Sequence, residues 1–463
     1  MAAVALFAAC GCSSGFSQKL DLPIGIPSIL ENPTPSGEPE TTQRLVPFPF
    51  LPPDLAHVDR EFLSEENNWY TKRDKRKIDE LGLLDFYSET GSRTAAVLPK
   101  LHNTSAGLEI YEVPENVTKE VFQRTEGPFR AGRTSLYMNS RPGRKLAKIK
   151  MGEAGECGLA YFHLSRLLGK LVEVPPATYR TLHIDEFNRV AQQARVTGNP
   201  ACTYFWSALR QQVAEKDADY VLPGGKFVYG TIAENPRGED SGPASYWTLG
   251  RIRQKSFYRV ITSKSPVAET LDLKDPASMQ NLALAQDLVR GVVLDEIFRQ
   301  ADRLGNISLE RLSHYVDHDG IVKWNDNIGP EVEAETLTRF VELDRIVYKD
   351  NDDGMLWNEK STTVSPVLQE TRHMDPVLYS RLQWLAGLMQ ESTGNSDDLV
   401  ERFFLDIVRI SPGNYKNLRK KVVEVAAELK ERVDADAIQL DLDFEGTVRK
   451  ILLGEIAASL SSP

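Results

Sequence analysis

The segment VLDEIFRQADRLGNI, residues 293–307, decides how this sequence is interpreted. It continues an apolar pattern at helical spacing and then enters a loop in which Asp302 and Asn306 stand four positions apart. Phosphoryl transfer uses such a pair, because an aspartate can orient or deprotonate the attacking hydroxyl and an asparagine can bind Mg²⁺. A helix end closed by Gly305 or Asn306 accounts for the same residues, so the segment gains a function only from its neighbours in the sequence.

Two lysines lie upstream on a predicted strand, Leu146–Met151. Lys148 and Lys150 point to the same side of that strand, because side chains alternate between its two faces. Either ammonium group could contact phosphates, although a strand with two solvated lysines fits the pattern as well. A helix predicted over 153–168 carries Glu156 near its start. A glutamate there can orient the strand lysine, or it can simply favour the helix dipole.

An acidic group follows a second predicted strand, Arg345–Lys349. Asp350, Asp352 and Asp353 stand together at a turn, where three carboxylates need a cation or full solvation. Asp350 is therefore a candidate metal ligand, and a polar hairpin turn is the alternative. Another acidic segment, Asp317–Gly320, lacks the remaining ligands of a calcium loop and is predicted to be a hairpin turn.

The predicted secondary structure changes near residue 235. Predicted strands dominate the part before it and predicted helices the part after it. This order predicts an α+β protein of two lobes, a β-rich N-lobe over 56–235 and a helical C-lobe over 236–463. Gly127 and Gly132, between predicted strands of the N-lobe, are candidates for a loop that covers a nucleotide.

The run ECGLAYFHLSRLLGKLVEVPPATY, residues 156–179, resembles the helix and Pro-Pro stretch of the secreted Golgi casein kinase family. It is similar also to the HipA toxin kinases and to the phosphatidylinositol 3-/4-kinases. In that superfamily a strand lysine precedes this helix, a later helix ends in a catalytic loop, and a strand then ends in a metal-binding aspartate. The lysine pair, the 293–307 segment and Asp350 stand here in the same order.

This resemblance implies a bilobal protein-kinase-like fold that binds ATP with Mg²⁺ or Mn²⁺. It implies that Asp302 is catalytic and that Asn306 and Asp350 bind the metal. Lys148 or Lys150 would contact phosphate, and the γ-phosphate would pass to a protein or lipid hydroxyl.

Three departures from the family pattern keep a second hypothesis open, a catalytically inactive pseudokinase or binding module. Leu304 stands where the family usually has histidine, and Asn306 lies one position closer to Asp302 than is common. Cys157 occupies the position of the family glutamate, so Glu156 lies one position away from it. The sequence therefore predicts the kinase fold more firmly than it predicts catalysis.

The composition of the chain limits which other classes of function are possible. The chain has 463 residues, a net charge of −11 and a pI near 5.4, so no positive field covers it and a general nucleic-acid binder is excluded. Among its four cysteines, Cys157 and Cys202 would form either a disulfide in an oxidising compartment or two free thiols.

The N-terminus resembles a bacterial lipoprotein signal over 1–12, in which Cys10 would be acylated. Residues 13–55 are rich in proline and predict an extended tether. Together they predict an exported protein of the cell envelope, on the periplasmic or surface side, held to the membrane by its lipid. A disordered N-terminus is the alternative.

Overall fold

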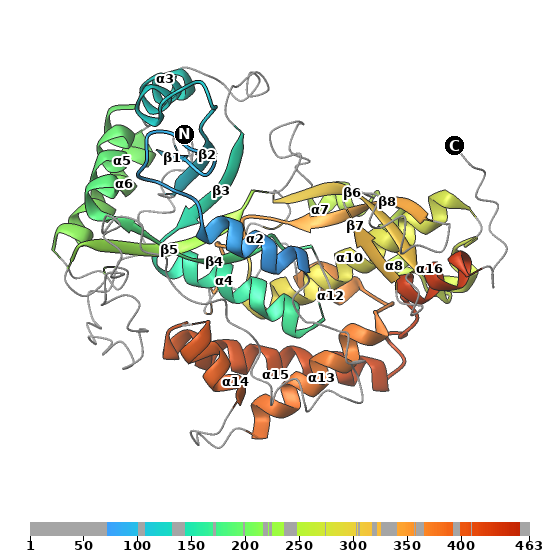
Figure 1. The fold of residues 1–463 in the computed structure, drawn as a ribbon. Coiled ribbons are helices and arrows are strands. Elements are labelled where there is room, and N and C mark those ends of the chain that lie inside the picture. The colour runs from blue at the N-terminus through green and yellow to red at the C-terminus, as the bar shows by residue number, and fades with distance from the viewer. Residues whose placement is uncertain are drawn as a thin grey trace.

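The fold combines two antiparallel sheets with helices packed around and between them (Figure 1). In the described part of the chain, five strands and five helices stand before residue 235, and three strands with the remaining helices follow it, so the predicted α+β class is confirmed. The computed structural model describes residues 72–100, 107–131, 144–169, 173–197, 200–215, 221, 225–235, 248–273, 275–301, 303, 306–316, 322–325, 340–355, 357, 365–391, 399–408 and 410–453. The predicted signal and tether therefore lie outside the described residues.

The first sheet has the strand order β1-β2-β3-β5-β4 and is antiparallel throughout. Its strands are β1 Ala95–Pro99, β2 Leu108–Glu112, β3 Lys145–Lys150, β4 Ala177–His183 and β5 Phe227–Glu234. The strand predicted over Leu146–Met151 is confirmed as β3. Apolar residues such as Val97, Ile110 and Ile149 pack against Phe187 and Trp206, so one face of the sheet lies on a core of its own.

Four helices accompany this sheet: α2 Lys72–Gly82, α3 Lys119–Ala131, α5 Ile184–Thr197 and α6 Pro200–Ala214. In Figure 1, α3, α5 and α6 gather with the sheet at the upper left. α3 disagrees with one prediction, because Gly127 lies within this helix and not in a loop between strands. The helix forms because Thr118 accepts a hydrogen bond from the amide of Val121 at its start and Phe122 is buried against β1 and β2.

Two helices form the centre of the larger core. α4, Gly152–Leu167, matches the helix predicted over 153–168, and α10 spans Pro276–Phe298. The α10 helix begins where the side chain of Asp275 accepts a hydrogen bond from the amide of Ser278, and it is buried over most of its length. A helix that is buried on all sides needs neighbours on all sides, and α4, α8 Ser256–Thr262, α12 Ser365–Glu370 and the second sheet are among those of α10.

The second sheet follows α10 directly. It has the order β7-β6-β8, with β6 Ile307–Val316, β7 Val322–Asn325 and β8 Phe340–Tyr348. The strand predicted at Arg345–Lys349 is the end of β8, whereas β6 was not predicted. Val316 pairs with Val322 in antiparallel register. The turn predicted at Asp317–Gly320 lies outside the described residues.

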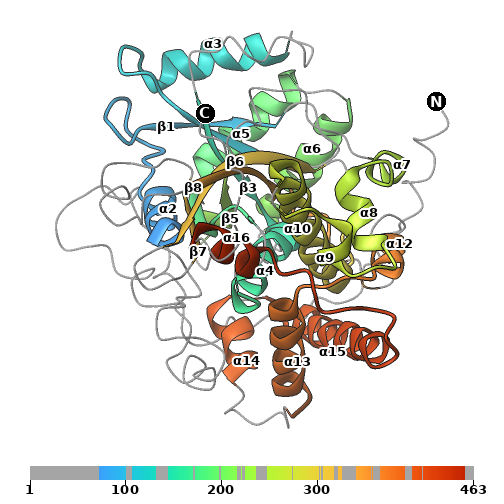
Figure 2. The same ribbon diagram turned by 90° about the vertical axis from the view of Figure 1, so that its right-hand side faces the viewer.

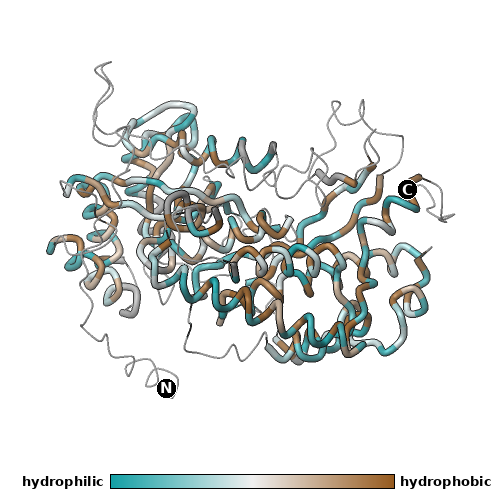
Figure 3. Tube along the Cα trace, turned by 90° about the horizontal axis from the view of Figure 1, so that it is seen from below, coloured by the Kyte–Doolittle hydropathy of each residue, from teal (hydrophilic) through white to brown (hydrophobic). Residues whose placement is uncertain are grey.

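The remaining helices build the far side of the second half. They are α7 Leu249–Ile252, α9 Val267–Thr270, α13 Pro376–Glu391, α14 Leu399–Arg402 with the π-helical turn Phe403–Ile407, α15 Pro412–Asp434 and α16 Phe444–Leu452. Figure 2 shows α13 and α15 side by side, and Gln383 joins them by donating to the carbonyl of Ala426 at 2.7 Å. The tube in Figure 3 alternates between hydrophilic and hydrophobic colours along its helices, as expected for helices with one buried face. None of the described helices is long and apolar enough to cross a bilayer.

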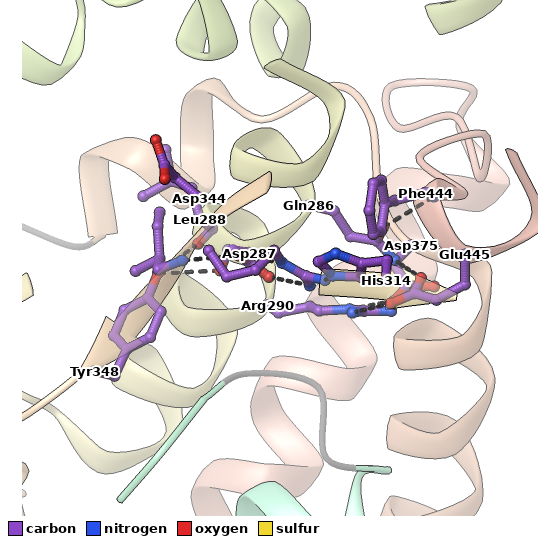
Figure 4. Close-up of polar contacts among 12 residues, drawn as sticks. Gln286, Asp287, Leu288, Arg290, His314, Asp344, Tyr348, Asp375, Phe444 and Glu445 are labelled. Atoms are coloured by element: carbon purple, nitrogen blue, oxygen red, sulfur yellow. Dashed lines mark hydrogen bonds and ion pairs between the residues drawn. The ribbon is translucent and has the colours of Figure 1, made fainter. Parts of the chain in front are cut away.

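A buried ion network fastens the second sheet to α10 (Figure 4). Arg345 on β8 donates to both carboxylate oxygens of Asp287, at 2.5 and 2.8 Å, and its Nη1 lies 2.9 Å from Nε2 of His314 on β6. Because the arginine is the donor, that histidine nitrogen must accept, which requires a neutral ring. Burial, followed by the charge of Arg345, lowers the pKa of His314 to about 3.

A second part of the same network reaches α16. Arg290 on α10 contacts Asp375 at 2.5 Å and Glu445 at 2.7 Å. Breaking a buried pair of this kind leaves a charge without compensation, at a cost of about 3–5 kcal/mol. The network therefore holds the second sheet and α16 against α10. Other residues set the geometry of the cleft described below.

Candidate active site

A cavity of about 60 Å³ lies between the first sheet and the turn that follows β8. Residues from both halves of the chain line it. Among these residues are Lys148, Lys150, Gly155, Thr231, Ala233, Glu234, Asp350 and Asp352. The candidate phosphate-binding lysines and the candidate metal-binding aspartate therefore share one cleft.

Two ion pairs cross this cleft from β3 to the turn. Lys148 Nζ lies 2.9 Å from Asp350 Oδ1, and Lys150 Nζ lies 2.5 Å from Asp352 Oδ2. The prediction that both lysines project from the same face of the strand agrees with this geometry. Burial alone would raise the pKa of Asp350, but the ammonium groups of Lys148 and Lys100 outweigh it and hold that pKa well below its ordinary value. Asp350 is therefore ionised at neutral pH.

Two glycines allow the backbone around Lys150 to pack closely. A Cβ on Gly155 of α4 would lie 2.4 Å from the carbonyl oxygen of Lys150, and one on Gly230 of β5 would lie 2.5 Å from the same atom. Real side chains do not approach a carbonyl this closely, so only glycine fits at either position. The hydroxyl of Thr231 adds a 2.8 Å hydrogen bond to the carbonyl of Gly155. The end of β3 that carries the lysines is thus held by both α4 and β5.

The turn that carries Asp350 is bonded to the end of α10. The amide of Ala301 donates to the carbonyl of Asp353 at 3.1 Å, and the amide of Met355 donates to the carbonyl of Phe298 at 2.6 Å. Asp350 has a φ of +49°, in the left-handed region where aspartate is one of the better-tolerated residues. The candidate metal ligand and the candidate catalytic loop are therefore parts of one bonded unit.

Arg303 is the centre of that unit, and sequence reasoning missed it. Its Nε lies 2.8 Å from Asp295 Oδ2, its Nη1 donates to the carbonyl of Lys349 at 2.8 Å, and its Nη2 donates to the side-chain oxygen of Asn351. The guanidinium is fully buried and lies 4.9 Å from the ring centre of Tyr348. One cation thus joins the end of α10, the end of β8 and the residue after Asp350.

Asp295, the partner of Arg303, is fully buried on the last turn of α10. Burial raises its pKa even though the neighbouring guanidinium lowers it. It also accepts a 2.8 Å hydrogen bond from the hydroxyl of Tyr161 on α4. The sequence signal for this cluster was an aspartate and an arginine within an apolar helix end, a position where charges need partners.

Asp302, the candidate catalytic residue, lies outside the described residues, as do Gly132 and Cys10. Its flanking residues are described, and both contact the acidic turn, Ala301 through Asp353 and Arg303 through Lys349. On the other side, the amide of Lys349 donates to the carbonyl of Asn306 at 3.2 Å. The backbone of Asn306 therefore lies beside the residue that precedes Asp350.

Glu156, which was expected to orient the lysine of β3, contacts the start of α15. Its carboxylate accepts a hydrogen bond from the amide of Ser411 and one from Nδ2 of Asn414 at 3.1 Å, both at the start of α15. The first amides of a helix lack intrahelical partners and carry partial positive charge, so a carboxylate is stabilised there. The carboxylate that pairs with Lys148 comes from Asp350 instead.

Lys100, a lysine beside the cleft, was also missed by sequence reasoning. It follows β1, and its amide donates to the carbonyl of Gly107 at 2.9 Å. Burial lowers its pKa to about 8, partly opposed by the carboxylate of Asp350. Lys100 stands outside the lysine pattern of β3, so only the pairing of β1 with β2 brings it to the cleft.

Cys157, for which the sequence left a disulfide or a free thiol open, is a buried free thiol. Its sulfur donates to the carbonyl of Asn351 at 3.2 Å. A Cβ on Gly354 would lie 2.8 Å from the same sulfur. Cys157 therefore packs α4 against the acidic turn.

The chain has distant likenesses among known proteins. No protein-family model matches the sequence, and no curated protein matches it. The fold is similar to the crystal structure of the Golgi casein kinase with Mn/ADP bound, with a TM-score of 0.35 and 11% identity over 89% of this chain and 96% of that one. A second crystal structure of the Golgi casein kinase matches with a TM-score of 0.33 and 9% identity over 82% and 84% of the two chains. At these values the chemistry has to be argued from the cleft itself.

Proposed function

We propose that this protein is an atypical kinase that binds ATP with Mg²⁺ or Mn²⁺ and transfers the γ-phosphate to a protein or lipid hydroxyl. The observation that carries the proposal is the 2.9 Å contact between Lys148 on β3 and Asp350 after β8. Phosphoryl transfer needs a strand lysine for the phosphates and an aspartate for the metal within one cleft, and these two residues meet that requirement.

The side-chain oxygens near the turn after β8 are suitable ligands for a hard divalent cation. Asp350 is ionised, and Mg²⁺ is usually held by one or two carboxylates together with substrate phosphates. Asp350 and the side chain of Asn306 would hold the metal, which would neutralise charge that develops on the transferred phosphoryl group. Asn351 is not part of this set, because its amide is engaged by Arg303 and by the carbonyl of Tyr348.

The remaining steps belong to residues of this chain. Asp302 accepts the proton of the attacking hydroxyl, whose oxygen forms the new bond to the γ-phosphorus as the bond to the β-phosphate oxygen breaks and ADP leaves. Lys148 exchanges Asp350 for a phosphate oxygen when the nucleotide enters. The cavity of about 60 Å³ is smaller than the roughly 300–1,000 Å³ of typical ligand sites, so a nucleotide would also extend beyond it.

Two measurements test the proposal. ATP with Mg²⁺ is expected to raise the thermal unfolding temperature, and the protein is expected to incorporate ³²P from γ-labelled ATP. Asp302→Ala and Asp350→Asn should abolish incorporation, whereas Asp185→Asn, an exposed aspartate on α5, should retain it. An unfolding temperature that stays constant at millimolar ATP would contradict nucleotide binding. Binding without incorporation would identify a pseudokinase.

We also propose that Cys10 carries a lipid that holds the protein in the cell envelope, with 13–55 as the tether. Expression in a bacterium with labelled palmitate is expected to label the wild type and to leave Cys10→Ser unlabelled. Label on both proteins would place the lipid elsewhere. This proposal is independent of the kinase chemistry.

A further inference from the structure

Lys100 and Gly107 are the described residues on either side of the connection between β1 and β2. Lys100 follows the last residue of β1, Gly107 precedes the first residue of β2, and the Lys100 amide donates to the Gly107 carbonyl at 2.9 Å. β2 pairs in turn with β3, the strand of Lys148 and Lys150. The sheet therefore places Lys100 two strands away from the cleft lysines and on the same end of the sheet.

The side chains of Lys100 and Lys150 pass over Gly107 together. A Cβ on Gly107 would lie 3.3 Å from Cε of Lys150 and 3.7 Å from Cδ of Lys100. Both chains therefore run along the same face of the sheet toward the turn after β8, where Lys150 contacts Asp352. A glycine at 107 leaves the space that these two chains occupy.

The charged groups that interact with Lys100 are side chains that line the cleft. Its ammonium group interacts with Asp350, Lys150, Lys148 and Asp352, and Asp350 is influenced by all three lysines. Among these five residues the lysines outnumber the aspartates. A polyphosphate is the ligand class that such a cluster favours, since it carries several negative charges over a short distance.

We propose that Lys100 is a third phosphate-contacting residue of the cleft, recruited from the β1–β2 connection to bind the phosphate chain of the nucleotide. This inference rests on the proposed function, because it assigns a further residue to the same nucleotide site. It differs from a purely structural role for Lys100, in which the ammonium would only stabilise Asp350 in the folded protein.

The test compares ATP with adenosine by isothermal titration calorimetry in the presence of Mg²⁺. Lys100→Met is expected to weaken ATP binding at least fivefold and to leave adenosine binding unchanged. Lys100→Arg, which keeps the positive charge, is expected to stay within about twofold of wild type for both ligands. Lys145→Met is the matched control, because Lys145 lies on β3 and pairs with Glu109 at 3.2 Å, and it should bind ATP as wild type does.

A second measurement needs no variant. Acetylation of lysines in the wild-type protein, read by mass spectrometry, is expected to modify Lys100 at least threefold more slowly when ATP and Mg²⁺ are present. Equal acetylation with and without ATP would overturn the assignment of Lys100, as would wild-type ATP affinity in Lys100→Met. If Lys148→Met weakens ATP binding while Lys100→Met does not, only this inference fails. If the wild type binds no ATP, the proposed function fails with it.

Discussion

Lys148 and Asp350 are separated by 202 positions in the chain, yet their side chains meet at 2.9 Å across the cleft. The contact joins a strand of the first sheet to the turn after the last strand of the second sheet. Because both groups are largely shielded from water, each favours the charged form of the other. The pair therefore holds both groups charged in the positions that a nucleotide and a metal would use.

Replacing either member of this pair should impair nucleotide binding. Lys148→Met and Asp350→Asn are each expected to weaken the affinity for ATP with Mg²⁺ at least tenfold, measured by calorimetry. Without nucleotide, each should lower the free energy of unfolding by about 1–3 kcal/mol, because the partner is left without its counter-charge. Glu109→Gln is the control, since Glu109 belongs to a similarly buried pair with Lys145. It should lose stability and keep its ATP affinity, and a parallel loss of affinity in the control would contradict a specific role for Lys148.

Two glycines of α4 provide a matched test of the packing around Lys150. Gly155→Ala places a methyl group 2.4 Å from the Lys150 carbonyl and should displace that end of β3, with lower stability and at least tenfold weaker ATP binding. Gly158→Ala, one turn along the same helix, meets no atom within 4 Å. It should raise the free energy of unfolding by about 0.5–1 kcal/mol, because alanine favours a helix interior over glycine. Chemical denaturation of both variants measures the difference, and equal effects would disprove the steric argument.

The Arg303 cluster should be the most sensitive site near the cleft. Arg303→Met leaves Asp295 buried without its cation and is expected to cost about 3–5 kcal/mol of unfolding free energy. The double variant Arg303→Met with Asp295→Asn removes both charges and should recover part of the loss. Denaturant titration measures both proteins and the single variant Asp295→Asn. If the double variant is as unstable as the sum of the single variants, the two side chains do not interact.

Two buried histidines predict a loss of stability in mild acid. Burial lowers the pKa of His163 and of His314 to about 3, against an ordinary value near 6.5 in the unfolded chain. The unfolded state therefore binds more protons below pH 6.5, so stability is complete above that pH and falls as the pH drops toward 3. Between pH 6 and 5 each histidine should remove up to about 1.4 kcal/mol. His314→Gln should flatten this slope in denaturation curves, and an unchanged slope would assign the loss to other groups.

Local sequence patterns placed β3, whose lysines alternate with apolar residues. They also placed α4 and the end of β8. They missed β6, in which Ile307 to Glu310 alternate between apolar and polar residues but Arg311 then breaks the alternation. The lobe boundary near residue 235 stays a prediction.

Sequence patterns predicted only those residues of the site that can be recognised from their immediate neighbours in the chain. Lysines on one strand face and a carboxylate at a strand end can be recognised from spacing, and Lys148, Lys150 and Asp350 do line the cleft. The partner of Glu156 lies more than 250 positions away in the chain, at the start of α15, and no local pattern contains that information. Lys100 was hidden for the same reason, because its place follows from strand pairing.

The Arg303 guanidinium has an evolutionary consequence. It holds Asp295 on one element and the residue after Asp350 on another, so a change at any of these positions requires a compensating change at the others. Among relatives of this chain, positions 295, 303 and 351 should therefore covary as a set. Such a set would identify distant homologues more reliably than the four-residue interval between Asp302 and Asn306, which many unrelated helix ends share by chance.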